Sequence, residues 1–276
     1  MSTPHNPAQA ITRRQALRLS AGSLLALGLW PGCATVQPAR AEAFSFLVVN
    51  DTHYMTPECG HWLEGVVRQM KTHRAIDFCL VVGDLADSGK PEQLGPVREI
   101  FSSLRVPIYT QLGNHDYLQQ TNRKAYEKTF PRRVNYWFEH GGWQFVGLDS
   151  TDGQKYQKTE IQPATFRWLD ENLPRLEKAK PTVLFTHFPL GIGVTYRPLN
   201  ADKLLERFRE FNLISVFNGH FHGFTEHQFQ HAAVTTNRCC SFQRGNHDKT
   251  LEKGYFLCAA KEGKISRSFV EFKAEA

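Results

Sequence analysis

Five short blocks of metal-binding residue types follow one another along this chain, each at the end of a run that predicts a β-strand. The blocks are Asp51-Thr-His53, Gly83-Asp84-Leu-Ala-Asp87, Gly113-Asn114-His115-Asp116, Thr186-His187 and Gly219-His220-Phe-His222. Side chains at the ends of neighbouring strands can meet above one edge of a sheet. The five blocks therefore predict a fold that brings carboxylate, imidazole and amide groups to one point.

The remaining pattern predicts the layers of this fold. Helical spacing predicts helices over 61–73, 91–104, 165–179 and 200–211, the last with Asn200 as its N-cap. Gly141-Gly142 between two β-type runs predicts a hairpin, and strands dominate after Leu213. Strand–helix units followed by strands predict an α/β domain over 42–276. We expect a four-layer α-β-β-α sandwich, with two mixed sheets face to face and helices outside.

The first 41 residues have the composition of a signal peptide. Arg13-Arg14 precede a mostly apolar run over 19–30, which is shorter than the roughly 20 residues that a membrane span needs. The arginine pair resembles a twin-arginine (Tat) signal, which implies the Tat translocase as a partner and a periplasmic location. Cleavage fits after Ala41 or after Ala43.

Two alternatives to a cleaved Tat leader stay open. A lipoprotein anchored through Cys33 is one, and an N-terminus retained in the cytoplasm is the other. No further segment is long and apolar enough to predict a membrane span, so none is expected in the mature chain.

The charge of the chain gives no support for a nucleic-acid partner. The formal net charge is +6, but the leader holds four arginines and no acid. Without the leader, 29 basic side chains stand against 27 acidic ones, a balance of about +2. No basic tail or Lys/Arg stripe remains, so we expect no nucleic-acid partner.

The cysteines indicate little about function. Cys79 and Cys258 lie in apolar runs and are interpreted as buried core residues. Cys59, Cys239 and Cys240 leave a disulfide between Cys59 and one of the pair as an open option.

The residue types in the five blocks suit hard divalent cations, which prefer carboxylate oxygen, neutral imidazole and amide oxygen. In an extended segment, residues two apart lie on the same face, so Asp51 pairs with His53 and His220 with His222. The glycines at 83, 113 and 219 are expected to allow tight turns beside the site.

The blocks resemble the calcineurin-like metallophosphoesterase family, whose pattern is D-x-H, GD-x-x-D, GNH-D/E, H and GH-x-H. All five elements occur in order over roughly residues 44–240. VVGDLADSG and GNHD are most similar to the bacterial branch that includes class III cyclic-nucleotide phosphodiesterases. Ser88 stands where the protein Ser/Thr phosphatases of this superfamily have an arginine, which argues against that branch.

The resemblance implies two metal ions, with Asp84 bridging them. Asp51, His53 and His222 would hold the first ion, and Asn114, His187 and His220 the second. It implies hydrolysis of a phosphomonoester or phosphodiester by a bridging hydroxide. His115, beside the phosphate with Asn114, would be the general acid, with charge stabilisation as its alternative role. Asp87 would orient His115 and favour its protonated form. Mn, Fe and Zn, as divalent or mixed-valence pairs, all suit this ligand set.

Several assignments remain open at this level. The substrate is a small phosphorylated molecule of unidentified class; a catalytically silent scaffold that binds a partner and a metal-dependent nuclease are the alternatives. Arg197 and Arg238 are candidates for a phosphate contact, against a solvated surface role. Asp116 is interpreted as a turn residue. The second Gly-Asn-His-Asp, residues 245–248, is interpreted as a polar turn, and a loop that reaches the substrate is the alternative.

Overall fold

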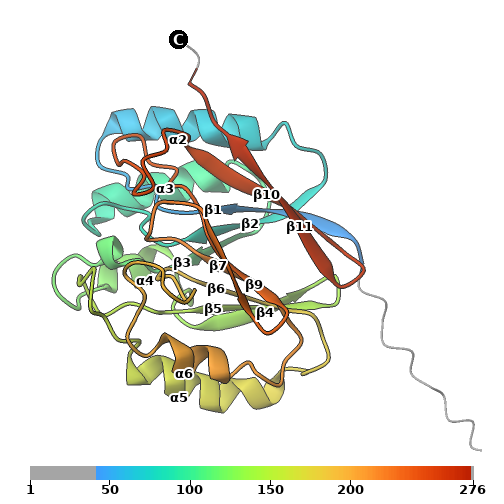
Figure 1. The fold of residues 1–276 in the computed structure, drawn as a ribbon. Coiled ribbons are helices and arrows are strands. Elements are labelled where there is room, and N and C mark those ends of the chain that lie inside the picture. Colours follow the sequence, from blue (N-terminus) through green and yellow to red (C-terminus); the bar gives the residue numbers. More distant parts are fainter. Residues whose placement is uncertain (1–41, 275–276) are drawn as a thin grey trace, which may run out of the picture. The chain divides into compact units, whose positions relative to one another are not determined.

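Two mixed β-sheets form the centre of the computed structural model, which describes residues 42–274 (Figure 1). The first sheet has the strand order β11-β10-β1-β2-β3. Its strands are β1 (Phe44–Val49), β2 (Ile76–Val82), β3 (Ile108–Gln111), β10 (Gly254–Lys261) and β11 (Lys264–Glu271). The second has the order β4-β5-β6-β7-β9-β8. Its strands are β4 (Tyr136–His140), β5 (Trp143–Leu148), β6 (Thr182–Thr186), β7 (Leu213–Asn218), β8 (Thr225–Phe229) and β9 (Ala232–Thr236).

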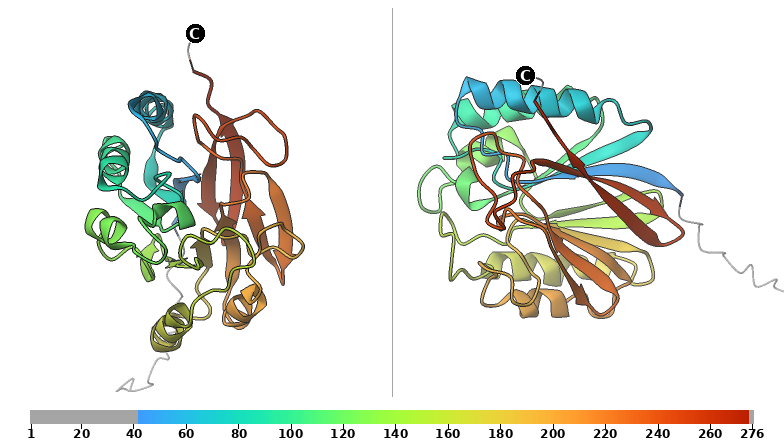
Figure 2. Two further views of the ribbon diagram at one scale, coloured as in Figure 1. Left: turned by 90° about the vertical axis from the view of Figure 1, so that its left-hand side faces the viewer. Right: turned by 45° about the horizontal axis from the view of Figure 1, so that its top comes forward.

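The helices cover the outer faces of the two sheets (Figure 2). Helices α2 (Pro57–Met70), α3 (Pro91–Ser102) and α4 (Lys124–Thr129) pack on the first sheet. Helices α5 (Pro163–Asn172) and α6 (Ala201–Glu206) pack on the second. An aromatic core fills the space between the sheets, and Phe46, Phe78, Phe145, Phe185 and Phe217 belong to it. The predicted sandwich of two mixed sheets with helices outside is confirmed.

Parallel pairing places the five blocks at one edge of the sandwich. Strands β1, β2 and β3 run parallel in the first sheet, and β5, β6, β7 and β9 run parallel in the second. The segments after the strands stay in contact, because the Asp51 amide donates to the Gly83 carbonyl at 3.1 Å and Gly219 to His187 at 2.9 Å. The amide of His220 donates to Asp51 Oδ2 at 2.9 Å, so the polar residues after the strands of the two sheets also contact one another.

The predicted hairpin is confirmed, but the boundaries of all four predicted helices differ from the prediction, notably at the start of α2 and the end of α5. Gly141 and Gly142 turn between β4 and β5 with φ of 54° and 79°. Helix α2 begins at Pro57 rather than at 61, because proline is suited to the first turn. Helix α5 ends at Asn172 rather than at 179, because Pro174 disfavours a continuing α-helix and lies in a 3₁₀ turn over Leu173–Arg175.

The helix predicted over 200–211 is the short α6, and the predicted cap is wrong. The Asn200 side chain makes no capping hydrogen bond to α6. Its Oδ1 accepts from the Ile161 amide at 2.8 Å, and its Nδ2 donates to the Ile161 carbonyl at 3.0 Å. Asn200 therefore ties together two loops. Helix α4 was not predicted.

Some predictions fall outside the described residues, among them the whole leader over 1–41 and Cys33. Within residues 42–274, no helix combines the length and apolar character needed to cross a membrane. The five cysteines in this part of the chain are buried and unpaired, so the disulfide considered for Cys59 is not formed there.

Candidate metal centre

The predicted ligands converge into two adjoining groups beyond the strand ends. One group contains Asp51, His53, Asp84 and His222, and the other contains Asp84, His187 and His220. Within each group, one ligand atom per residue lies within 4.8 Å of the others. Asp84 belongs to both groups, as a carboxylate that bridges two cations would.

The Asp84 carboxylate lies between the two groups. Its Oδ2 is 3.5 Å from His53 Nε2 and 3.3 Å from His187 Nε2. Asn114 joins the second group, with its Oδ1 3.3 Å from His187 Nε2. Asp51 Oδ1 lies 3.2 Å from His222 Nε2 in the first group. All seven predicted ligands are thus brought together.

The four histidines have the ring orientation that metal binding requires. One nitrogen of each ring contacts an acceptor oxygen outside the two groups, which leaves the other nitrogen directed at the predicted ligand atoms. For His53, His187, His220 and His222, the outer acceptors are Asp87 Oδ1 (3.2 Å), Val82 O (3.2 Å), Tyr156 O (2.8 Å) and Gly245 O (3.1 Å). The inner nitrogens lie among the carboxylates and the other predicted ligands, so the residues fit two hard or borderline cations.

Burial and close contacts between carboxylates and imidazoles shift the pKa values of the residues in the centre. Burial would raise the pKa of Asp51, but His222 outweighs it and lowers the pKa to about 2. Burial would lower the pKa of His187, but Asp84 outweighs it and raises the pKa to about 9. Burial and the neighbouring His187 lower the pKa of His220 to about 3. A metal ion would replace the proton on His187.

Five of the predicted ligands have a left-handed backbone, so the extended segments expected at Asp51–His53 and His220–His222 are not formed. The φ angles of Asp51, His53, Asp84, His220 and His222 lie between 44° and 64°. Residues with a Cβ rarely adopt this conformation, and it is concentrated at functional sites. The backbone therefore bends at the ligand itself, which turns its side chain toward the centre.

The glycines beside the ligands have two different roles. Gly83 has a positive φ of 77°, as a tight turn requires. Gly113 has a φ of −108°, but a Cβ there would lie 2.1 Å from Asp84 Oδ1. At Gly219 a Cβ would lie 2.7 Å from Asp51 Oδ2. Close approach of the carboxylates, rather than a turn, excludes side chains at 113 and 219.

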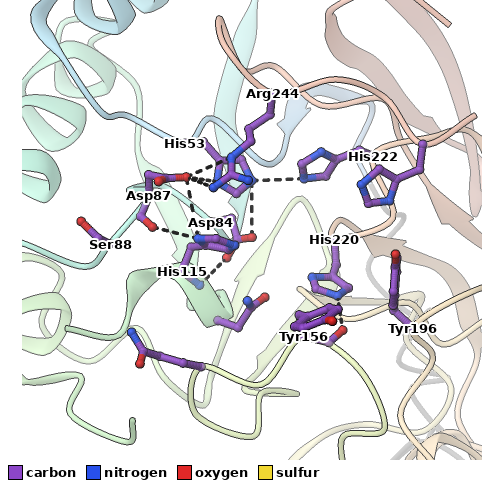
Figure 3. Close-up of a pocket in the computed structure, with 13 residues that line it drawn as sticks. His53, Asp84, Asp87, Ser88, His115, Tyr156, Tyr196, His220, His222 and Arg244 are labelled. Carbon is purple, nitrogen blue, oxygen red and sulfur yellow. Dashed lines mark hydrogen bonds and ion pairs between the residues drawn. The ribbon is translucent and has the colours of Figure 1, made fainter. Parts of the chain in front are cut away.

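His115 stands at the mouth of the centre rather than among the ligands (Figure 3). Its amide donates to Asp84 Oδ1 at 2.9 Å, and its Nδ1 donates to the Asp87 backbone carbonyl at 2.8 Å. The Asp87 carboxylate is 3.8 Å from Nδ1, and its closer partners are His53 and Arg244. The predicted contact between Asp87 and His115 is therefore made through the Asp87 backbone carbonyl.

The Asp87 carboxylate is held in its ionised form. Burial would raise its pKa, but hydrogen bonds from His53 and Arg244 outweigh burial and lower the pKa to about 2. His53 needs no charge for this contact, because a neutral imidazole donates through Nδ1 and burial lowers the pKa of His53.

A cavity of about 520 Å³ opens above the centre. Sequence reasoning missed five of its lining residues, which come from loops: Gln154, Tyr156, Tyr196, Arg244 and His247. Only Arg244 and His247 lay near a motif, the second Gly-Asn-His-Asp. Ser88 also lines the cavity.

Arg197 and Arg238 have other partners and are absent from the cavity lining. Arg197 pairs with Asp202 and donates to the Leu190 carbonyl. Arg238 donates to Thr250 Oγ1 at 3.0 Å and lies over the Phe269 ring.

Asp116 has a structural position, in agreement with its interpretation as a turn residue. It is fully buried, and it accepts hydrogen bonds from the amides of Ala86 and Gly113, both at 2.9 Å. These bonds join the second and third blocks.

The second Gly-Asn-His-Asp contacts the predicted ligand His222. Besides the carbonyl of Gly245, the amide of His247 donates to the His222 carbonyl at 2.9 Å. The His247 ring stacks on the His222 ring, with centroids 5.1 Å apart. This segment is therefore a turn that also packs against the predicted ligand His222.

Comparison with solved structures shows the fold. A dimetal phosphatase from Danio rerio superposes with a TM-score of 0.64 at 14% identity, over 82% of this chain and 95% of that one. A purple acid phosphatase from yellow lupin (Lupinus luteus) seeds superposes with a TM-score of 0.62 at 12% identity, over 85% and 52% of the two chains.

Comparison with curated proteins finds bacterial phosphodiesterases. A glycerophosphodiester phosphodiesterase of Enterobacter lignolyticus is 27% identical over 68% of this chain and 74% of its own length. A 3′,5′-cyclic-nucleotide phosphodiesterase of Nostoc is 27% identical over 53% of this chain, and the match spans 56% of that protein.

The family follows from the ordered blocks, the sandwich and one further finding. Residues 44–224 match the family described as calcineurin-like phosphoesterase, and this range contains all seven predicted ligands. The chain therefore belongs to the calcineurin-like phosphoesterase family and is a metal-dependent phosphoesterase.

Proposed function

We propose that the protein hydrolyses a phosphodiester or phosphomonoester of a small molecule with two metal ions. Asp51, His53 and His222 would hold one ion. Asn114, His187 and His220 would hold the other, and Asp84 would contact both. The observation that carries the proposal is the position of Asp84 Oδ2 between His53 Nε2 and His187 Nε2. Two bound ions would acidify a water to hydroxide as the nucleophile and withdraw charge from the phosphoryl group.

His115 is proposed as the general acid that protonates the leaving oxygen. With Nδ1–H donating to the Asp87 carbonyl, the Nε2 atom is the one available to a substrate in the cavity. The hydrogen bond from the His115 amide to Asp84 Oδ1 holds the backbone of His115 beside the carboxylate that would bind both metals. Asn114, next to it, is proposed to contact both metal and phosphate.

We propose a diester as the first substrate class to test, because the relatives at 27% identity are named as phosphodiesterases. The purified mature protein, loaded with Mn²⁺, is expected to hydrolyse bis-aryl phosphate. Rates on bis-aryl and mono-aryl phosphate, then on glycerophosphodiesters, nucleotides and single-stranded nucleic acid, would assign the substrate. Loading with Fe and Zn in parallel would identify the active ions.

The Asp84→Asn variant provides the decisive control. It is expected to lose metal and activity together, since Asp84 contacts both ligand groups. An Asp84→Asn protein that keeps both metals and full activity would contradict the proposed centre. A wild-type protein that binds two metals yet hydrolyses no phosphoester would instead favour a silent scaffold.

We also propose that the leader directs export through the Tat route to the periplasm. This route exports folded proteins, so the metals could be inserted before export. A reporter fused to residues 1–43 is expected to be exported, and Arg13-Arg14→Lys-Lys is expected to block export. Unchanged export of the Lys-Lys fusion would exclude the Tat route; lipid labelling lost in Cys33→Ala would indicate a lipoprotein.

A further inference from the structure

Arg244 brings a guanidinium group to the metal centre from a loop far along the chain. The loop joins β9 to β10 and folds over the ligand His222. The backbone at Arg244 is fixed, because its amide donates to Ser241 Oγ at 3.0 Å and its carbonyl accepts from Lys253. Only the side chain is left to move.

The guanidinium is the cation of the cavity wall. Of the arginines and lysines in residues 42–274, only Arg244 lines the cavity, together with Asp84, Asn114 and His115. Its side chain is 40% exposed. In Figure 3 it lies above His53 and points toward Asp87.

The partner of Arg244 is shared with another donor. Arg244 Nε and one terminal nitrogen both reach Asp87 Oδ1, the oxygen that also accepts from His53 Nδ1 at 3.2 Å. The second terminal nitrogen of Arg244 has no hydrogen-bond partner among the described residues. Part of the donor fork thus remains open to a ligand in the cavity.

We propose that Arg244 is a substrate-binding residue that holds a non-bridging oxygen of the phosphoryl group, with Asp87 keeping the guanidinium in place until the phosphate arrives. Guanidinium groups bind phosphate through two parallel, charge-assisted hydrogen bonds. The position of Arg244 at the cavity wall, beside His115 and the metal ligands, suits this contact. The proposal rests on the proposed function, since it concerns the same site.

A positioning role is the competing explanation. If Arg244 only immobilised Asp87, it would affect phosphate through His53 and His115 and would matter only while the Asp87 carboxylate is present. If it binds the phosphate, its removal weakens phosphate binding whether or not residue 87 carries a charge. The Asp87→Asn background separates the two roles.

The test measures binding of inorganic phosphate to the Mn²⁺-loaded protein by calorimetry. Arg244→Gln is expected to raise the dissociation constant about tenfold or more, and Arg244→Lys by less, because it keeps the charge but not the fork. Arg207→Gln is the matched control: Arg207 is 44% exposed, pairs with Asp170 and is not among the cavity-lining residues. It is expected to bind phosphate as the wild type does.

Three results would overturn the proposal. They are unchanged phosphate binding in Arg244→Gln, an equal loss in Arg207→Gln, and no further loss when Arg244→Gln is added to Asp87→Asn. Metal content measured for each variant ensures that the comparison is made at equal loading. Absence of turnover on every phosphoester would reject the proposed function, whereas phosphate binding reports on Arg244 alone.

Discussion

The tetrapeptide Gly-Asn-His-Asp occurs at 113–116 and again at 245–248, and the two copies occupy opposite sides of the same centre. In the first copy, Asn114 Oδ1 contacts the predicted ligand His187, the His115 amide donates to Asp84 Oδ1, and both residues line the cavity. In the second, Asn246 binds its own loop, and His247 stacks on His222. The same four residues therefore supply the predicted ligand Asn114 where they follow a strand, and contact the predicted ligand His222 where they lie in a loop.

The largest difference is expected between the two histidines. His115→Ala should lower kcat by about 10²- to 10⁴-fold, the usual contribution of a general acid, with metal content nearly unchanged. His247→Ala should cost less than about tenfold, because the ring packs against a ligand without being one. Steady-state kinetics with metal analysis would check both, and equal losses would break the distinction between the copies.

The two glycines sharpen the comparison through stability. A Cβ at Gly113 would lie 2.1 Å from Asp84 Oδ1 and 2.2 Å from the Asp84 amide nitrogen, whereas at Gly245 none of the described atoms lies within 4 Å. Gly113→Ala should cost about 1–3 kcal/mol of unfolding free energy and reduce metal binding. Gly245→Ala should be nearly neutral. Urea unfolding of both variants would measure the difference in stability. An unchanged unfolding free energy in Gly113→Ala would contradict the close contact between Gly113 and Asp84.

The two asparagines should separate metal binding from loop order. Asn114→Ala should weaken the second metal by at least about 10- to 100-fold, with little change in the fold. Asn246→Ala should keep metal but destabilise the loop by about 1–2 kcal/mol, because Asn246 bonds the Cys239 amide and the carbonyls of Thr250 and Glu252. Metal titration and hydrogen exchange of the loop measure the two effects. Metal loss in Asn246→Ala with full metal binding in Asn114→Ala would contradict the roles given to the two asparagines.

The smallest effect is a pH dependence of stability at Asp87, where Arg244 of the β9–β10 loop contacts its carboxylate. The folded pKa of Asp87 is about 2, below its ordinary 3.8, so the ionised carboxylate stabilises the fold above about pH 4. That contribution, on the order of 1–2 kcal/mol after allowing for partial exposure, is lost as the pH falls toward 2.

Unfolding of metal-free protein would test this contribution. The stability difference between wild type and Asp87→Asn should be full at pH 5 and shrink toward pH 3. Asp170→Asn is the control, since Asp170 pairs with Arg207 and is 52% exposed. A difference that grew on acidification would contradict the pairing of Asp87 with Arg244 and His53.

The features that could be predicted from the sequence are those that follow from regular strands: the positions of the predicted ligands and the layers of the fold. Each predicted ligand block follows a buried strand, so pairing of β1 with β2 brings Asp51 to Asp84, and pairing of β6 with β7 brings His187 to His220. Packing of the two sheets against each other then brings the two pairs together. Resemblance to a family supplied their roles. The layers followed from the alternation of strands and helices in the same way.

Loops were the part that the sequence could not predict. Arg244 reaches Asp87, 157 residues away in sequence, and Tyr156 reaches His220 through its backbone carbonyl. Neither contact leaves a periodic pattern, because each depends on how two loops pack. Asn200 was misassigned for the same reason: an asparagine before a helix resembles a cap, but a neighbouring loop offered it a better partner.

The left-handed backbone at Asp51, His53, Asp84, His220 and His222 has a consequence for protein engineering. Grafting the seven ligand side chains onto regular strand ends of another scaffold would not recreate the centre, because extended residues project their side chains in other directions. A successful transplant must carry the five unusual φ angles as well, and the recipient must supply about 1–3 kcal/mol for each from its own packing. The transferable unit is therefore the bent backbone together with its ligands.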